Sequence, residues 1–350
     1  MKKHVLLATG LAVLSTSAFA TKSRMAALGQ NTDRGSFYIE DTRNVFRNAS
    51  ALNNTKNYLV TEWGDSNASE TVEGGFFREM GSFAYGLYLG DEANGTFDRS
   101  NSNFLKQDNN LDLMFAGDMG VKWGARLHYT SSEDESGAFK KENDGLGLGL
   151  GIEMGAIEVY ANLDLKDESK GAATADDKFE GDGMVLGASY NMGAMTFFAD
   201  YETNTKEETV SGTKTETDYT AMTVGVGHIH EVTSTARVFT DIAYATTETE
   251  VKGGTKTETT ALPLTVGFES DATSWLTLRG SVKQNVIINE TKTDGKKKST
   301  NNTTDVAAGA TLNFGKLKVD GVIGTDGSGN ENGNLRTDAL MSKVAVHYWF

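Results

Sequence analysis

Apolar and polar residues alternate by twos along most of the chain, and the final residues show this most clearly. Val344, Val346, Tyr348 and Phe350 fall on one face of an extended segment, and the residues between them fall on the other. Side chains of a strand alternate between two faces, so this segment predicts a strand with one apolar face. The same alternation recurs from residue 57 onward. It therefore favours one large sheet over an isolated edge strand of a soluble protein.

Counting the alternating segments back from the carboxy-terminus predicts sixteen strands. Fourteen is the alternative, reached if residues 73–90 form one long strand and residues 57–64 lie outside the wall. Most segments have the ~9–12 residues that a tilted strand needs to cross a bilayer. The predicted strands lie near residues 57–64, 73–79, 82–90, 110–117, 120–130, 144–153, 156–166, 182–192, 194–203, 217–229, 234–247, 258–269, 274–288, 303–314, 316–324 and 337–350.

Short connections alternate with long polar connections. Five short ones contain glycine, namely Met80-Gly81, Met119-Gly120, Met154-Gly155, Met192-Gly193 and Phe314-Gly315, and two further tight connections are residues 230–233 and 270–274. Glycine supplies the positive φ that tight hairpin turns require. Such alternation is typical of outer-membrane barrels, whose short turns face the periplasm and whose long loops face outside. The predicted long loops span residues 91–110, 131–144, 167–182, 203–216, 247–258, 289–303 and 324–336.

These patterns predict an all-β protein, a transmembrane antiparallel β-barrel over residues 57–350. In lipid every backbone polar group must be paired within the protein, and a closed ladder pairs them all without leaving an edge. The single proline fits a chain made mostly of ladder. Residues 21–56 do not alternate, and we expect them to form an N-terminal plug or periplasmic segment. Within it, residues 23–29 predict a helical turn or two, and residues 36–39 a short strand.

Residues 1–20 have the features of a secretory signal peptide. Lys2 and Lys3 precede an apolar run over residues 5–14, and Ala18 and Ala20 form a small-x-small cleavage site. The run is too short to span a bilayer, so we expect Sec-dependent export and cleavage after Ala20. The mature chain then carries 31 basic and 48 acidic residues, a net charge of −17. This balance argues against a nucleic-acid partner, and the absence of cysteine excludes disulfides.

A barrel of this size leaves an aqueous bore, and alternation indicates which side chains line it. Both signs of charge occur, which predicts a polar lining with weak ion selectivity. For any single member, a paired or solvated side chain without a role in selectivity is the simpler interpretation. Residues 91–110 can fold inward to narrow the bore, and the glycines of residues 145–151 keep one inner face small. The predicted channel-lining residues are Lys122, Arg126, His128, Glu158, Asp164, Lys166, Asp200, Glu202, Arg237, Asp241, Arg279, Lys283, Asp305, Lys318 and Lys343.

The sequence indicates no catalytic, cofactor-binding or metal site. His228 and His230 share one strand face but have no third ligand nearby, and a chance pair is the simpler reading. A barrel lipase needs a serine beside a histidine, whereas His128 has only a threonine at that spacing. Residues 326–338 alternate acids and amides, but Glu331 stands where a calcium loop needs glycine. Aromatic residues near strand ends predict interfacial girdles, namely Tyr129, Tyr160, Tyr190, Tyr201, Tyr244, Trp275 and Tyr348.

Three motifs near the N-terminus indicate which class of outer-membrane barrel the chain resembles. Ser23-Arg24-Met25-x-Ala27-Leu28-Gly29, Tyr38-Ile39-x-Asp41-x-Arg43-Asn44-Val45-Phe46-x-Asn48-Ala49 and Thr61-Glu62-Trp63-Gly64 resemble the porin-like major outer-membrane proteins of predatory and related delta-type bacteria. The resemblance covers about residues 21–90 and is architectural beyond them. The terminal strand resembles the signal, here Val344, Val346, Tyr348 and Phe350, that the barrel-assembly machinery reads.

The resemblance implies a porin of the Gram-negative outer membrane, a passive diffusion channel for small hydrophilic solutes and ions. It implies surrounding lipid and lipopolysaccharide, and the homotrimer common among general porins is one assembly it suggests. No active site is carried over. Two alternatives stay open. One is a gated transporter of hydrophobic compounds with an N-terminal hatch, although residues 48–50 lack the proline of that family's Asn-Pro-Ala word. The other is a structural or adhesive surface barrel.

Overall fold

The computed structural model describes residues 21–64, 72–90, 99, 103–107, 109–299, 304–325 and 340–350. The proposed signal peptide, with Ala18 and Ala20, and the acidic stretch 326–338 lie outside these residues. None of the described helices is long and apolar enough to cross a bilayer.

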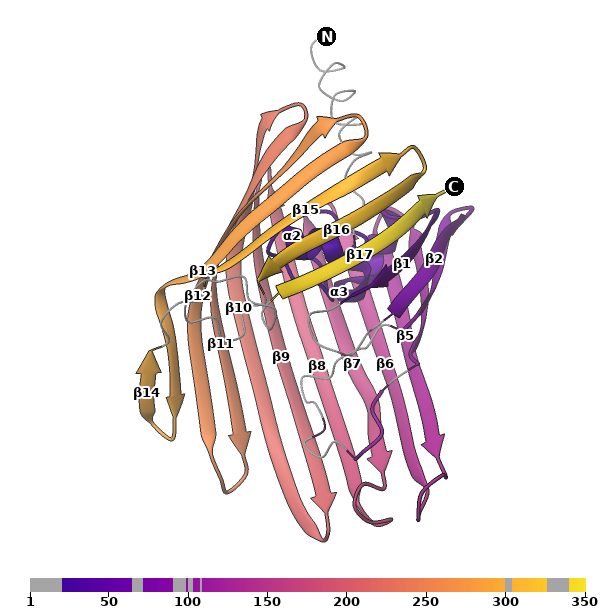
Figure 1. The fold of residues 1–350 in the computed structure, drawn as a ribbon, viewed down its shortest axis with the longest axis vertical. Helices are drawn as coiled ribbons and strands as arrows, with labels where there is room; N and C mark the ends of the chain where they lie inside the picture. Colours follow the sequence, from indigo (N-terminus) through magenta and orange to yellow (C-terminus); the bar gives the residue numbers. More distant parts are fainter. Residues whose placement is uncertain are drawn as a thin grey trace.

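Sixteen strands of the described chain form one closed antiparallel ring (Figure 1). The last strand, β17, pairs with β16 on one side and with β1 on the other, and this pairing closes the ring. A seventeenth segment, β14, pairs only with the outer part of β13. The predicted sixteen-strand barrel is confirmed. The bounds are β1 Tyr58–Trp63, β2 Val72–Met80, β3 Phe83–Leu89, β4 Leu111–Asp118, β5 Lys122–Asp134, β6 Lys141–Met154, β7 Ile157–Lys170, β8 Lys178–Met192, β9 Met195–Val210, β10 Thr213–Thr233, β11 Ala236–Val251, β12 Lys256–Thr273, β13 Leu276–Thr293, β14 Lys296–Ser299, β15 Asp305–Phe314, β16 Leu317–Thr325 and β17 Leu340–Trp349.

The wall is tall on one side and low on the other. Strands β5 to β13 extend far beyond β1 to β4 and β15 to β17 at the end opposite the short turns, as Figure 1 shows. Five short turns lie where glycine predicted them, and the other two lie at residues 234–235 and 274–275, slightly later than expected.

The predicted long loops are wrong for most of the tall side, because their polar residues continue the ladder. Residues 203–216 form a hairpin in which Val210 pairs with Thr213. Its turn residues, Ser211 and Gly212, both have positive φ, as a type I′ turn requires. Residues 131–144, 167–182 and 247–258 likewise consist largely of strand. Threonine, which recurs in residues 203–216 and 247–258, fits a pleated surface even where both faces meet water. Most of residues 91–110 and 324–336 lies outside the described chain.

A β-bulge in β7 reverses the side on which one predicted lining residue lies. Asp164 and Asp167 both face inward, and Leu165 and Lys166 stand between them on the outer side. Lys166 is half-exposed and forms an ion pair with Asp144 (3.2 Å). Its prediction as a channel-lining residue is therefore wrong, since one extra residue shifts the alternation.

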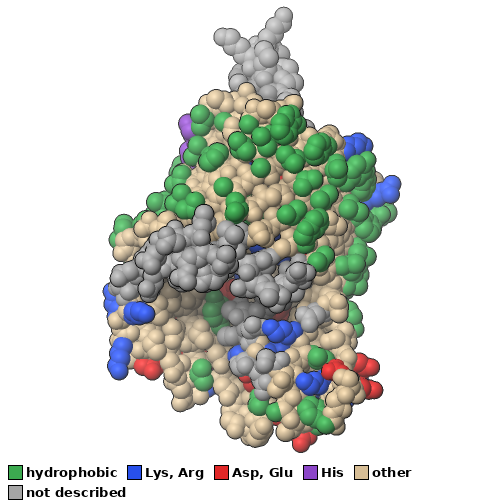
Figure 2. Space-filling view, in the orientation of Figure 1, with side chains coloured by type: hydrophobic (Ala, Val, Ile, Leu, Met, Phe, Trp, Pro, Cys, Tyr) green, Lys and Arg blue, Asp and Glu red, His purple; other side chains and the backbone are tan. Residues whose placement is uncertain are grey.

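The outer surface of the ring is apolar near the short turns and polar at the tall end. Figure 2 shows hydrophobic side chains gathered over the upper part of the molecule, with most of the acidic and basic side chains of this view below them. Large apolar side chains such as Leu150, Ile152 and Phe197 are exposed on the outer face of the ring. Of the predicted girdle, Tyr160 is the exception, because it faces inward and its hydroxyl bonds Asp200. Tyr160 lies two residues from both Glu158 and Asn162 on β7, so all three side chains share the inner face of the strand.

Residues 21–56 lie inside the ring. Helices α2 (Lys22–Ala27) and α3 (Asn44–Arg47) are seen behind β15 to β17 in Figure 1, and a 3-10 helix, η1, spans Ala49–Asn53. The expected helical turn at residues 23–29 is confirmed by α2. The expected strand at residues 36–39 is wrong, as residues 37–39 form bends.

Inward-facing glycines make room for this segment. A Cβ on Gly124 would lie 2.2 Å from the Ala49 carbonyl oxygen, and one on Gly151 would lie 1.8 Å from Asn48 Oδ1. A Cβ on Gly227 would lie 2.3 Å from the ring of Tyr38. These glycines are therefore required by close approach of the segment, and the expectation of a small inner face over residues 145–151 is confirmed.

The apolar outer belt predicts a position-dependent cost for a charge. Leu150→Arg places a guanidinium mid-belt, where we expect destabilisation by about 2–4 kcal/mol in a bilayer. Thr209→Arg, on the same outer face near the tip of β9, is the matched control, with an expected cost of about 0–1 kcal/mol. Equilibrium unfolding in lipid vesicles by denaturant measures both. Equal costs at the two positions would contradict a lipid-covered belt.

One acidic residue ties two outer turns together. Asp177 accepts hydrogen bonds from the backbone amides of Ala173 (2.7 Å), Thr174 (2.8 Å) and Ser211 (2.7 Å). Burial alone would raise its pKa, but these donors lower it to about 2. The contact contributes its full stabilisation above the ordinary pKa of the carboxyl, near 4, and loses it as the pH falls through about 2.

We therefore expect the amides of Thr174 and Ser211 to exchange faster with solvent deuterium as the pH falls from 4 to 2, after correction for intrinsic rates. Asp177→Asn should remove this extra pH dependence. The matched control is the Thr205 amide, which lies within the ladder. If Thr174 and Ser211 stay as protected at pH 2 as at pH 4, the carboxylate does not hold the turns.

Candidate functional site

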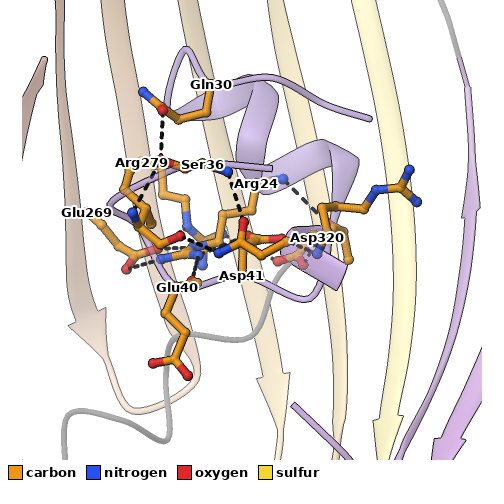
Figure 3. A network of polar contacts seen from close by, with 12 residues as sticks. Arg24, Gln30, Ser36, Glu40, Asp41, Glu269, Arg279 and Asp320 are labelled. Carbon is orange, nitrogen blue, oxygen red and sulfur yellow. Dashed lines mark hydrogen bonds and ion pairs between the residues drawn. The ribbon is translucent and has the colours of Figure 1, made fainter. Parts of the chain in front are cut away.

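The centre of the bore contains a buried network built around Arg24 of α2 (Figure 3). Arg24 Nε contacts Glu269 Oε2 on β12 (2.8 Å), and Arg24 Nη1 contacts Asp41 Oδ2 (3.0 Å). Arg24 and Asp41 are fully shielded from solvent. Burial alone would lower the pKa of Arg24, but the two carboxylates raise it above its ordinary value. This ion pair joins the segment to the wall.

Glu269 is shared by two further wall arginines. Arg237 of β11 binds its Oε1 (2.6 Å), and Arg279 of β13 binds its Oε2. Arg279 also reaches Asp320 of β16 (3.4 Å), whose other oxygen accepts a hydrogen bond from the hydroxyl of Thr21 (3.1 Å). The first residues of the segment therefore bind Glu269 and Asp320 directly, and through these two acids they are linked to Arg237 and Arg279.

A second network holds Arg43, at the start of α3. Arg43 Nη1 contacts Glu73 of β2 (2.9 Å) and Glu62 of β1 (3.4 Å) and donates to the hydroxyl of Tyr88 (3.0 Å). The guanidinium also lies over the ring of Phe46, 4.0 Å from its centroid. All of these side chains are buried. Arg43 therefore anchors the segment to the wall next to the β1–β17 seam.

Apolar packing complements these ion pairs. Val45, Phe46 and Leu52 of the segment pack against inward-facing apolar side chains of the low wall, Tyr58, Val60, Phe77, Ala84, Tyr88, Met114 and Ala116. Met25, Leu28 and Ile39 pack against Phe239 of β11. The inner face of the low wall is thus partly apolar, because it is covered by protein and not by water.

A cavity of about 350 Å³ remains between the segment and the inner faces of β5 to β8. Its walls are mainly polar. The lining residues are Phe37, Tyr38, Ile39, Glu40, Asp41, Asn44, Arg47, Ser50, Ala51, Asn54, Thr55, Lys122, Glu153, Glu158 and Asn191. At one side Lys122 pairs with Glu153 (2.6 Å) and donates to Asn54 (2.8 Å). The cavity is therefore shaped jointly by the segment and by the wall.

The structure places the other predicted lining residues on the inner face, and it brings many of them against the segment. Direct contacts with the segment are made by Lys122, Arg126, Glu158, Glu202 and Asp241. Arg237 and Arg279 reach it through Glu269. His128 shares Asp112 with Arg126, and Asp200 bonds Tyr160. Lys283 lies opposite Asp305 in the ladder, and Asp164, Lys318 and Lys343 face inward by alternation.

The sequence did not point to the residues that hold the segment. Arg24, Arg43 and Arg47 lie in a stretch without periodicity. The wall acids that bind the segment, or that bind wall cations beside it, were not singled out either, although alternation places each of them on the inner face. They are Glu62, Glu73, Asp112, Glu153, Glu269 and Asp320.

The described part of the β3–β4 connection also contacts the inner face. Arg99 Nη2 donates to Asn143 Oδ1 (2.6 Å) and to Asp167 Oδ1 (2.8 Å). Phe104 packs with Ala172 and Phe179. These residues of the connection therefore fold inward, as predicted.

Outside the bore, His228 and His230 share the outer face of β10, with ring centroids 6.2 Å apart. Among the residues that the structure describes, no three His, Asp or Glu side chains are grouped to hold a metal ion.

Comparison with solved structures returns barrels of the outer membrane. The toluene transporter TodX of Pseudomonas putida is 12% identical over 92% of this chain and 95% of its own, with a TM-score of 0.39. The outer-membrane protein OmpT of Vibrio cholerae, in trimer form, is 12% identical over 84% and 97%, with a TM-score of 0.40. A porin is 13% identical over 84% and 99%, with a TM-score of 0.40.

At these identities and TM-scores nothing about solute, gating or assembly follows for this chain. No family model matches it, and no curated protein matches it. The resemblance to the porin-like proteins of predatory bacteria therefore stays a prediction.

The Arg24 network predicts how firmly the segment is held. Arg24→Met leaves Asp41 buried without its arginine, a change that typically costs about 3–5 kcal/mol. We expect trypsin to cut the folded variant after Arg43 and Arg47, which the wild-type barrel buries. Fragment masses after limited digestion in detergent give the result.

The control is Lys140→Met, which removes exposed ion pairs at an outer turn and should cost about 0–1 kcal/mol. Full protection of Arg43 and Arg47 in Arg24→Met would show that the network does not hold the segment.

Proposed function

We propose that the chain is an outer-membrane diffusion channel for small hydrophilic solutes and ions, narrowed by residues 21–56. The observation that carries this proposal is the polar cavity that the segment leaves beside β5 to β8. Solutes pass such a constriction according to its diameter and the charges that line it. The segment acts as a fixed plug that sets both, and the wall charges that contact it complete the lining.

The contacts of the segment favour a fixed plug over an ejected hatch. Expelling it would uncover Glu62, Glu73 and Glu269, all buried and all paired with arginines. Breaking buried pairs is costly, because each leaves a charge without its partner. A solute that passes beside the segment meets none of these costs.

The character of the cavities disfavours the alternative of a transporter for hydrophobic compounds. That function would favour an apolar pocket inside the bore. Among the described residues, an apolar hollow of about 600 Å³ lies instead on the outer face, over β6 to β10, lined by side chains such as Leu186, Tyr201 and Met222. The space between the segment and the low wall is filled by Phe46 and its neighbours.

We also propose that the leader over residues 1–20 directs Sec-dependent export and that the assembly machinery reads the strand that ends at Phe350. Lipid and lipopolysaccharide surround the barrel, and a homotrimer is the assembly that the resemblance to general porins implies. The resemblance of residues 21–90 supports a place among the porin-like proteins of predatory and related bacteria.

Planar-bilayer recording tests the channel. We expect purified wild-type protein to give stable unit conductance steps in potassium chloride. A variant lacking residues 23–56 should give larger steps, since the bore of a sixteen-strand ring is wide enough for water. Heat-modified gel mobility confirms that each preparation is folded.

Folded wild-type protein without conductance steps would overturn the proposal. Long closures that vanish only when a hydrophobic solute is added would support the hatch.

A further inference from the structure

One arginine of the segment differs from the others in having no acidic partner. Arg47 is only 4% exposed, and its Nε and Nη1 atoms have no hydrogen-bond partner among the described residues. Its guanidinium lies over the rings of Phe37 (4.6 Å to the centroid) and Tyr160 (6.0 Å). Ring faces attract a cation but leave its N–H groups unsatisfied.

Arg24 and Arg43 are equally buried, but each of them contacts two carboxylates. A buried guanidinium without such a partner is unfavourable, because its N–H groups lose their hydrogen bonds to water. Burial accordingly lowers the pKa of Arg47 below its ordinary value. Arg47 also lines the 350 Å³ cavity, so an acceptor bound there would lie beside a guanidinium that has no carboxylate partner.

The same cavity contains acidic groups that are not neutralised by arginine or lysine. The carboxylate of Glu40 is exposed, points away from the Arg24 network in Figure 3 and makes no hydrogen bond or ion pair with the described residues, so it is free to bind a cationic group. Glu158 accepts one hydrogen bond, from Asn48 (3.3 Å). The remaining acids of the cavity are neutralised, Asp41 by Arg24 and Glu153 by Lys122.

We propose that this cavity is a binding site for a small zwitterion of the α-amino acid class. The solute's carboxylate binds the Arg47 guanidinium, and its ammonium binds the Glu40 and Glu158 carboxylates. This rests on the proposed channel function and names its solute class. A volume of about 350 Å³ is at the small end of ligand pockets, which span roughly 300–1,000 Å³.

Simple ions fit the cavity less well. A free anion at Arg47 would meet Glu40 and Glu158, and a free cation at these acids would meet Arg47. A zwitterion satisfies both signs at once and adds no net charge. The side chains of Asn44, Ser50 and Asn191 supply further donors and acceptors around it. Charge-assisted hydrogen bonds at both ends give such a solute its advantage over a neutral molecule of equal size.

Isothermal titration calorimetry of the full mature protein in detergent tests the site without requiring conduction. The probes are L-alanine, its N-acetyl derivative, which lacks the ammonium, and its amide, which lacks the carboxylate. We expect alanine to bind and each derivative to bind about tenfold more weakly, because each derivative loses one charge-assisted hydrogen bond to the site.

Two variants assign the ends. Arg47→Gln should weaken alanine and N-acetylalanine by about tenfold and leave alaninamide unchanged, whereas Glu40→Gln should weaken alanine and alaninamide only. Arg47→Lys should restore part of the alanine affinity. Arg78→Gln, at an exposed arginine of β2, is the control and should change nothing. Gel mobility shows that each variant is folded.

The outcomes separate this inference from the proposed function. Wild-type protein that conducts but does not bind alanine overturns the inference and leaves the channel standing. Protein that binds alanine but never conducts overturns the channel. Equal weakening of all three probes by Arg47→Gln means that Arg47 only supports the fold, and this also overturns the inference.

Discussion

The pairing of β17 with β1 is the constraint on which the rest depends. Once these strands share a register from Tyr58–Trp349 to Trp63–Val344, the ladder is closed and no edge remains. A closed ring of sixteen strands has a bore that its own side chains cannot fill. The interior must therefore contain water or additional chain. Here residues 21–56 occupy part of it, and the arginines of this segment meet the acids of the wall on both sides of the seam.

The segment explains features of the wall that would otherwise conflict with a wet bore. Tyr58, Val60 and Phe77 face inward although they are apolar, because Phe46 and Leu52 cover them. Gly124, Gly151 and Gly227 weaken their strands locally, but the segment's backbone and side chains take the space of the missing Cβ atoms. Buried ion pairs add little net stability compared with apolar packing, but they specify one position, since a displaced Arg24 or Arg43 would leave buried carboxylates unpaired.

The sequence predicted the ring because one apolar face recurs at every crossing, and alternation is sufficient to place strands such as β5 and β15. It failed where that contrast disappears. Residues 203–216 are polar on both faces, since the bore and the exterior are both wet there, and a ladder of threonine and glutamate looks like a loop. Lys166 was predicted to face the bore, because the β-bulge that turns it outward has no recognisable signal in the sequence. The partners of Arg24 and Arg43 were not predictable. Alternation along a strand shows that Glu269 or Glu73 faces the bore, but it does not show which residue of the segment each acid contacts.

The arginines of the segment divide by what the wall provides for them. Arg24 and Arg43 form ion pairs with carboxylates on strands far apart in sequence, so carboxylates of the protein itself neutralise their charge. Arg47 is similarly buried, yet its guanidinium lies over the rings of Phe37 in the segment and Tyr160 in the wall and forms no ion pair with the described residues. Folded proteins satisfy buried polar groups almost everywhere, and exceptions cluster at functional sites. A fully satisfied bore would have indicated a purely structural filling, whereas a buried arginine that lacks hydrogen-bond partners and lines a cavity supports our proposal that a solute completes it.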